Sequence, residues 1–216
     1  MSDLSSMAGL IVVVISFAAI IISLTIHEFF HGFSAKLLGD DTAESQGRLT
    51  LNPLAHIDPF GTILLPLMLS LTGLPAFGWA RPVPVNPYNF KNPKSAMAIV
   101  SVAGPLSNLL LAILALIFLK IFSPSLGLEN LLIIFLYSLV VVNAVLLTFN
   151  LIPLPPLDGS KVLFGILPDK YESFKYWLST NGPYVLFGII IIDSFLGLGI
   201  FNFLFGLVLR LLNLFI

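Results

Sequence analysis

Cysteine is absent from this chain of 216 residues, and charged side chains are scarce. Without cysteine the chain has no disulfide, no thiolate metal ligand and no cysteine nucleophile. Charged residues make up 10% of the sequence, whereas soluble domains contain about 25%. The net charge of −1 gives no basic surface for nucleic acid, so nucleic-acid partners are not expected.

Apolar residues are correspondingly abundant and account for 57% of the chain. A transmembrane helix needs roughly 20 consecutive apolar residues, so this length accommodates about five or six of them with short loops. We therefore expect an all-α polytopic membrane protein that forms a single integral-membrane domain over residues 1–216. We therefore expect the lipid bilayer to be one of its partners.

The apolar runs and their interruptions give the expected order of elements. A first helix is expected from Ala8 to Leu38, and Ser45–Asn52 contains β-forming residues in partial alternation that predict a short strand or hairpin. Thr62–Leu74 is short and contains a proline, which predicts a re-entrant segment. The remaining spans are expected at Ser95–Ile121, at Leu131–Leu151, and as two short apposed helices within residues 183–216.

Eight of the ten basic residues lie in or beside three of the connecting segments. The positive-inside rule places these segments on the cytoplasmic side and the N-terminus outside. The N-terminal MSDLSSM lacks the basic region of a signal peptide, so we interpret the first apolar run as a retained helix. The basic residues concerned are Lys36, Arg48, Arg81, Lys91, Lys94, Lys161, Lys170 and Lys175.

The sequence His27-Glu28-Phe29-Phe30-His31 follows an apolar run, Ala8–Ile26, that contains no ionised side chain. On a helix, H-E-x-x-H places two imidazoles one turn apart on the same face, as a single zinc ion requires. The glutamate between them can act as a general base on a zinc-activated water. Ionisable groups are costly in a bilayer, so this motif predicts a functional site.

A catalytic zinc site uses three protein ligands and one open position, so a third ligand must lie elsewhere in the chain. Glu44, His56 and Asp58 are candidates by residue type, but Asp158 is the strongest. It follows an apolar span broken by prolines, where irregular backbone at membrane depth lines a polar cavity. An ordinary Asp-Gly turn at a membrane surface is the alternative interpretation of this position.

Three segments together resemble the site-2 protease family of intramembrane zinc metalloproteases. They are the H-E-x-x-H motif, the Gly104–Asn108 sequence GPLSN, and Asn150–Gly159 with its N-x-x-P and L-D-G elements. Arg48–Pro53 and His56–Pro59 also resemble a bacterial subgroup. The resemblance extends to about residue 170 and points to a compact bacterial or archaeal type without a PDZ or CBS domain.

The resemblance implies a role for each matching residue. His27, His31 and Asp158 match the ligands of one zinc ion per chain, within a core at about residues 8–165, and Glu28 matches the general base. Asn150 matches an asparagine that stabilises the oxyanion or orients the substrate. Among the other polar residues, Asn108 and Asn143 either line the cavity or bridge helices, and His56 is expected in a loop or behind the ligands.

The implied reaction is hydrolysis of peptide bonds within or near transmembrane segments of other membrane proteins. A helical substrate must unwind first, and Ser45–Asn52, together with the extended Gly78–Asn92 loop, is expected to hold it by edge pairing. The expected location is a prokaryotic inner membrane, with the site toward the cytoplasm. The sequence specifies neither the substrate nor the oligomeric state.

Three other functions are alternatives for this chain. A membrane metal transporter would need several acids along its spans, but Asp193 alone lies deep in the remaining apolar helices, and we expect it to have a structural or interfacial role. An inactive homologue that binds membrane helices is disfavoured by the presence of Glu28. A prenyl-protein protease would expect a glutamate ligand downstream, whereas the L-D-G sequence offers Asp158.

Overall fold

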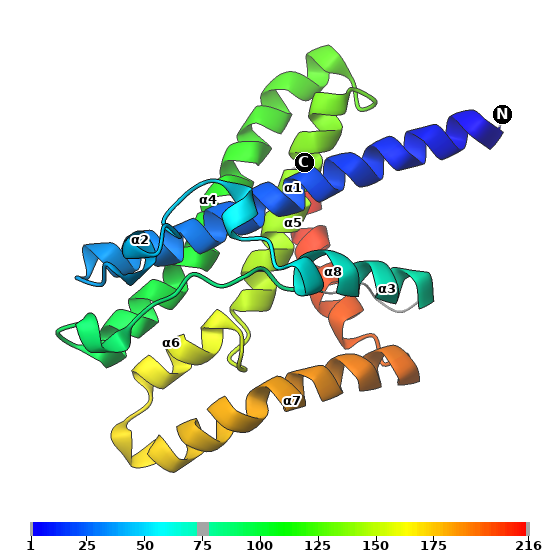
Figure 1. Ribbon diagram of the computed structural model, residues 1–216. Coiled ribbons are helices and arrows are strands. Elements are labelled where there is room, and N and C mark those ends of the chain that lie inside the picture. Colours follow the sequence, from blue (N-terminus) through cyan, green and yellow to red (C-terminus); the bar gives the residue numbers. More distant parts are fainter. Residues whose placement is uncertain (1, 73–77, 215–216) are drawn as a thin grey trace.

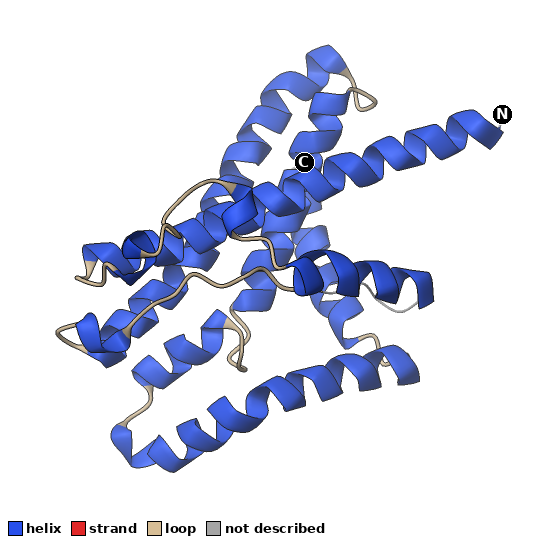
Figure 2. Cartoon of the chain, in the orientation of Figure 1, coloured by secondary structure: helices blue, strands red, loops and turns tan. Residues whose placement is uncertain are grey.

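The computed structural model describes residues 2–72 and 78–214, and within them every regular element is helical (Figure 2). The short elements are 3₁₀ turns at Pro53–Ala55, Pro87–Asn89 and Asp169–Tyr171 and a π-helix at Pro59–Leu64. The α-helices are α1 (Ser2–Leu37), α2 (Thr42–Ser45), α3 (Leu65–Thr72), α4 (Pro93–Leu126), α5 (Leu131–Asn150), α6 (Asp158–Ile166), α7 (Glu172–Leu196) and α8 (Ile200–Asn213). The all-α prediction is confirmed.

Four of the described helices are long and apolar enough to cross a bilayer, at Gly9–Leu37, Pro93–Leu126, Leu131–Asn150 and Asp169–Leu196. The apolar segments Pro59–Leu69 and Ile200–Leu212 are shorter. The chain is therefore an integral membrane protein with four candidate spans in the described residues, fewer than the five or six expected. The difference arises because the last 34 residues do not supply two spans: α7 already begins at Glu172 and only α8 follows it.

Helices α1, α4 and α5 form the centre of the molecule, and α4 crosses both of the others as well as α6 (Figure 1). Their contact is built from small and branched residues, which let helix backbones approach closely in a membrane. Ala19, Ala115 and Val140 are almost fully buried in this core. The close crossing of α1 and α4 also brings polar side chains of the two helices together.

The strand expected at Ser45–Asn52 is not formed. Ser45 ends α2, and the following residues form turns and bends. Gly47 has a positive φ of 65°, and the N–H groups of Arg48 and Leu49 both donate to the Ala43 carbonyl. These local bonds use backbone groups that a strand would offer to a partner, so the β-propensity of the segment is overridden.

The segment expected to be re-entrant is a short helix. Asp58 caps it, with its carboxylate accepting hydrogen bonds from the N–H groups of Phe60 and Gly61. The helical turns then run through Pro59–Leu64 and α3 to Thr72, and the last two residues of the expected segment lie outside the described residues. This length is too small to cross a bilayer.

Asp193 stabilises the start of α8. Its carboxylate accepts hydrogen bonds from the N–H groups of Ile200 (2.7 Å) and Phe201 (3.3 Å), the first two residues of that helix. A helix N-terminus leaves such N–H groups unpaired and favours a negative charge nearby. The structural role expected for Asp193 is confirmed.

Asp40 joins the end of α1 to the segment before α4. Its side chain is fully buried and accepts hydrogen bonds from the Asn86 N–H (2.7 Å), the Asn89 side chain (2.7 Å) and Thr42. Burial of this carboxyl acts to raise its pKa, but the hydrogen bonds outweigh burial and hold the pKa of Asp40 below its usual value.

Acid is therefore expected to destabilise this junction. A carboxyl whose pKa is lower in the folded state stabilises the fold above its unfolded pKa, and that contribution is lost as the pH falls below about 4. As the pH is lowered, the thermal unfolding midpoint of the wild type should decrease more steeply than that of Asp40→Asn, because the asparagine has no charge to lose. Equal slopes for the two proteins would contradict this assignment.

Candidate metal centre

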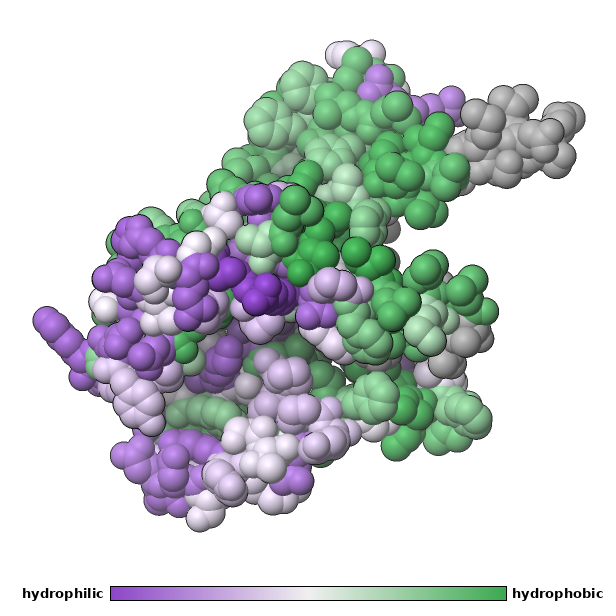
Figure 3. All heavy atoms as spheres, in the orientation of Figure 1, coloured by the Kyte–Doolittle hydropathy of each residue, from purple (hydrophilic) through white to green (hydrophobic). Residues whose placement is uncertain are grey.

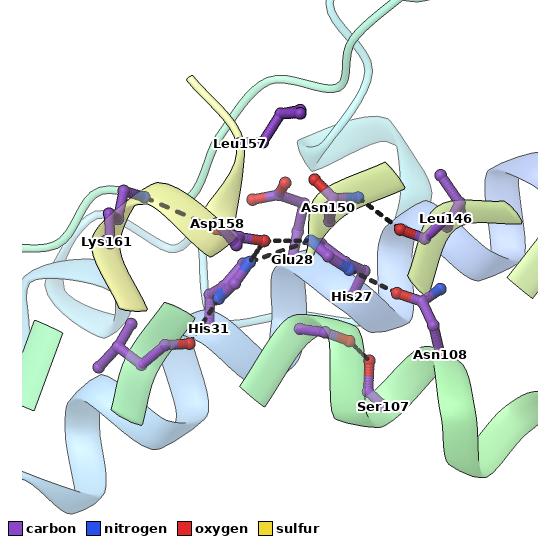
Figure 4. Close-up of polar contacts among 12 residues, drawn as sticks. His27, Glu28, His31, Ser107, Asn108, Leu146, Asn150, Leu157, Asp158 and Lys161 are labelled. Carbon is purple, nitrogen blue, oxygen red and sulfur yellow. Dashed lines mark hydrogen bonds and ion pairs between the residues drawn. The ribbon is translucent and has the colours of Figure 1, made fainter. Parts of the chain in front are cut away.

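Helices α1 and α6 bring His27, His31 and Asp158 together, although Asp158 follows His31 by 127 residues (Figure 4). Asp158 Oδ2 lies 3.2 Å from His27 Nε2 and 3.1 Å from His31 Nε2, and the two Nε2 atoms are 3.0 Å apart. All three side chains are buried, and their ligand atoms lie within 4.8 Å of one another. The structure thus assembles the three residues that the sequence pattern selected.

The orientation of both imidazoles suits metal binding. His27 Nδ1 lies 2.5 Å from Asn108 Oδ1, and His31 Nδ1 lies 2.7 Å from the Val100 carbonyl. Oxygen atoms of this kind only accept, so each Nδ1 carries the proton and each Nε2 presents a lone pair toward Asp158. This is the arrangement in which metal-binding histidines are held.

Gly104 of α4 supplies the space for the two rings. A Cβ atom at this position would lie 2.4 Å from His31 Nε2 and 2.7 Å from His27 Cε1. Two imidazoles and one carboxylate are ligands that Zn²⁺ prefers, and three protein ligands leave a position for water. The donor set fits a catalytic zinc ion.

Asn108 and Asn143 form a chain of hydrogen bonds that runs from His27 into the interior of the protein. Asn108 donates to Asn143 Oδ1 (2.7 Å), and Asn143 donates to Ser23 Oγ (2.8 Å) and to the Leu139 carbonyl (2.8 Å). Both asparagines are fully buried. They therefore bridge α1, α4 and α5, which is one of the two arrangements that the sequence left open.

Replacing Asn108 by alanine is expected to weaken zinc binding about 10- to 100-fold, the usual effect of losing the partner behind a histidine ligand. The reason is that the His27 ring would lose the hydrogen bond that fixes its orientation. Zinc affinity measured by competition with a chromogenic chelator tests this. Ser138→Ala is the matched control, because Ser138 bonds to the Ile134 carbonyl of its own helix and to none of the three candidate ligands. Equal affinities for the two variants would refute the role of Asn108.

Glu28 is held by the loop that precedes α4. Its Oε2 accepts a hydrogen bond from the Val83 N–H (2.8 Å), within an extended segment at residues 78–86. The same segment is anchored by the Arg81 N–H, which donates to the His56 carbonyl (2.9 Å). In Figure 4 the Glu28 side chain lies next to those of the three ligands and Asn150.

Asn150 is the last residue of α5, one short connection before Asp158. Its side-chain amide donates to the Leu146 carbonyl (3.0 Å), which leaves its second N–H and its oxygen available. Gly159 allows the connection to fold tightly, since a Cβ there would lie 2.4 Å from the Leu151 carbonyl oxygen. The L-D-G turn therefore places Asp158 close to the end of α5.

The other acidic and histidine candidates lie elsewhere. His56 is buried and its Nε2 donates to the Thr50 carbonyl (2.8 Å), so it belongs to the loop and does not contact the three ligands. Glu44 is exposed and pairs with Lys36 at 2.6 Å. Neither residue belongs to the group of ligands.

Sequence reasoning missed several contacts of the site, among them the one between the Val100 carbonyl and His31 Nδ1. The Val83 N–H that orients Glu28 has no side-chain signal, because any residue other than proline could provide it. Another missed contact is that of Lys161, whose Nζ lies 3.7 Å from Asp158 Oδ1. The sequence does indicate it, because a basic residue three positions after an acidic one lies on the same face of a helix.

The chain is similar to known proteins of one peptidase family. The model of the family described as Peptidase family M50 matches residues 119–187, a range that includes Asn150 and Asp158. A Bacillus subtilis protein named "Putative zinc metalloprotease YwhC" is 46% identical over 155 residues, which cover 69% of this chain and 67% of that protein. The "Putative zinc metalloprotease Rip2" of Mycolicibacterium smegmatis is 37% identical over 71% of this chain and 57% of its own length. No solved structure matches the chain.

Proposed function

The chain belongs to peptidase family M50, the site-2 protease family, and we propose that it hydrolyses peptide bonds within or near transmembrane segments of membrane proteins. The observation that carries this proposal is the buried group of His27, His31 and Asp158 beside Glu28, assembled from two helices of an integral membrane protein. The relatives bear the name of zinc metalloproteases, which supports zinc as the cofactor.

His27, His31 and Asp158 would hold the zinc ion through Nε2, Nε2 and a carboxylate oxygen. Zinc bound there supplies Lewis-acid polarisation of a water molecule and of the scissile carbonyl. Asn108 and the Val100 carbonyl hold the two imidazoles in the required tautomer and orientation. Gly104 leaves the space that both rings occupy.

Glu28 is the proposed general base. Its carboxylate accepts the proton of the attacking water and returns it to the leaving amine. The Val83 N–H binds one carboxylate oxygen and fixes its direction, while the second oxygen stays available for the proton. Asn150 has one side-chain N–H not used by Leu146, and this group is the proposed donor to the oxyanion.

The extended segment at residues 78–86 is the proposed contact for an unwound substrate. Ser45–Asn52 forms turns and offers no strand edge, so the substrate clamp expected from the sequence is narrowed to the second of its two segments. The Val83 N–H binds Glu28, which places this segment directly beside the proposed base. A substrate backbone along the segment would therefore pass close to the reacting groups.

The proposed location is a prokaryotic inner membrane with the site toward the cytoplasm. The basic residues after α1, before α4 and around α6 support this orientation through the positive-inside rule. His27 and His31 occupy the last third of α1, toward the end that carries Lys36. Water then reaches the site from the cytoplasmic side.

The first experiment reconstitutes the purified protein in vesicles with a model substrate that has one transmembrane helix. We expect cleavage within or near that helix, loss of cleavage after metal chelation, and recovery on adding zinc. Zinc uptake into the vesicles without cleavage would favour the alternative, a membrane metal transporter. Binding of the helix without cleavage by the zinc-loaded protein would favour an inactive homologue.

A further inference from the structure

An open cavity of about 440 Å³ lies outside the metal centre, between the start of α4, helix α6 and the first turns of α7. Hydrophilic side chains gather on this side of the molecule, where α6 and α7 face the first turns of α4 (Figure 3). Lys94, Lys161 and Lys175 contribute to its walls, one from each helix, together with apolar surface from Met97 and Phe164.

The two carboxylates of the cavity are exposed, and among its three lysines Lys175 is buried, whereas the side chains of Lys94 and Lys161 are 40% and 45% exposed. Asp169 and Glu172 have side chains that are 88% and 74% exposed, whereas the Lys175 side chain is 9% exposed. Asp169 pairs with Lys94 at 2.8 Å, and Glu172 pairs with Lys175 at 3.1 Å. Two of the three lysines are thus ion-paired with exposed carboxylates.

Among the three lysines of the cavity, Lys161 has the longest ion-pair distance. In the described part of the chain its Nζ has one ion-pair partner, Asp158 Oδ1 at 3.7 Å, which is too long for a hydrogen bond. Asp158 is also the proposed zinc ligand, so its charge is shared with the two histidines and the metal. The ammonium group of Lys161 therefore remains available to an anion in the cavity.

The cavity is expected at the depth of the lipid head groups, because it lies between the first turns of two candidate spans. Two of its walls are the first turns of the candidate spans that begin at Pro93 and Asp169. Tyr176 lines it, and the adjacent Trp177 is 53% exposed, in agreement with the aromatic residues that gather at membrane interfaces. Basic pockets between transmembrane helices on this side of a membrane are typical sites for anionic head groups.

We propose that this cavity binds the phosphate of an anionic glycerophospholipid, with Lys161 as the principal ammonium ligand. Its volume lies within the roughly 300–1,000 Å³ of small-ligand sites, and its apolar wall suits the glycerol and the first methylenes of the chains. Free phosphate has the same chemistry and is the competing source. This proposal does not depend on proteolysis.

Native mass spectrometry of the zinc-loaded protein in detergent tests the proposal, with phosphatidylglycerol, phosphatidylcholine and inorganic phosphate as separate probes. We expect saturable binding of phosphatidylglycerol, with little binding of the other two. Lys161→Gln should raise its apparent dissociation constant about fivefold. Lys170→Gln is the matched control, because Lys170 is a nearby lysine that lies over the Tyr171 ring outside the cavity, and it should leave the constant unchanged.

Equal effects of the two substitutions would overturn the site, since they would indicate non-specific attraction of anionic lipid to the surface. Equal binding of phosphatidylcholine and phosphatidylglycerol would overturn the charge argument. Binding of inorganic phosphate that depends on Lys161, without binding of phosphatidylglycerol, would overturn the lipid assignment in favour of a soluble phosphate compound. Each result is independent of cleavage, so failure of the proposed protease function would not affect it.

Discussion

Glu28→Gln is expected to retain zinc and to lose cleavage by about two to four orders of magnitude, the usual contribution of a positioned general base. The amide has nearly the shape of the carboxylate, and its oxygen still accepts the hydrogen bond from the Val83 N–H. It has no basic site for the proton of the attacking water. The substitution therefore removes the chemistry and leaves the fold and the ligands in place.

Zinc content and cleavage of the helical substrate must be measured on the same preparation of this variant. Retained zinc with lost cleavage supports the role of Glu28. Normal cleavage by the variant would mean that another group accepts the proton, and the assignment of Glu28 would be wrong. Loss of zinc would show that the residue acts on the metal itself.

Gly104→Ala is expected to weaken zinc binding by about a hundredfold or more, the upper end of effects seen when the surroundings of a metal ligand change. The added Cβ would lie 2.4 Å from His31 Nε2, so the ring must move away from His27 and Asp158. Helix α4 cannot easily retreat, because its Asn108 side chain is hydrogen-bonded to both α1 and α5. Cleavage should fall with zinc content.

Gly188→Ala provides the matched control for this prediction. Gly188 also lies inside an apolar helix, α7, but a Cβ there meets no atom within 4 Å. Its zinc content should equal that of the wild type, and its helix should gain slightly in propensity. If both glycine variants kept full zinc occupancy, the close approach at Gly104 would not constrain the site.

Much of the site could be predicted because its chemistry leaves local signals. H-E-x-x-H places two candidate ligands and a candidate base by helical spacing alone, and proline breaks an apolar span just before Asp158. Helix α1 was likewise predicted closely: it ends at Leu37, one residue before the expected end. These features depend on composition and period, which a single sequence contains.

The rest depends on contacts between distant segments that carry no such period. The turns after α2 form because the Ala43 carbonyl accepts two N–H groups, although the sequence there favours a strand. The bounds of the last helices were not predicted, because α7 includes a polar stretch that resembles a loop. Asp40 looks like part of a helix end, and only the folded chain shows that it binds Asn86 and Asn89.

The hydrogen bonds that begin at His27 return to their own helix. They run through Asn108 of α4 and Asn143 of α5 to Ser23, which lies one turn before His27 on α1. A ring of this kind closes only when all three helices have the correct axial register, and a slip by one turn would leave several buried amides unpaired. The axial register that this ring requires of the three helices is therefore also the register that orients the His27 imidazole toward Asp158.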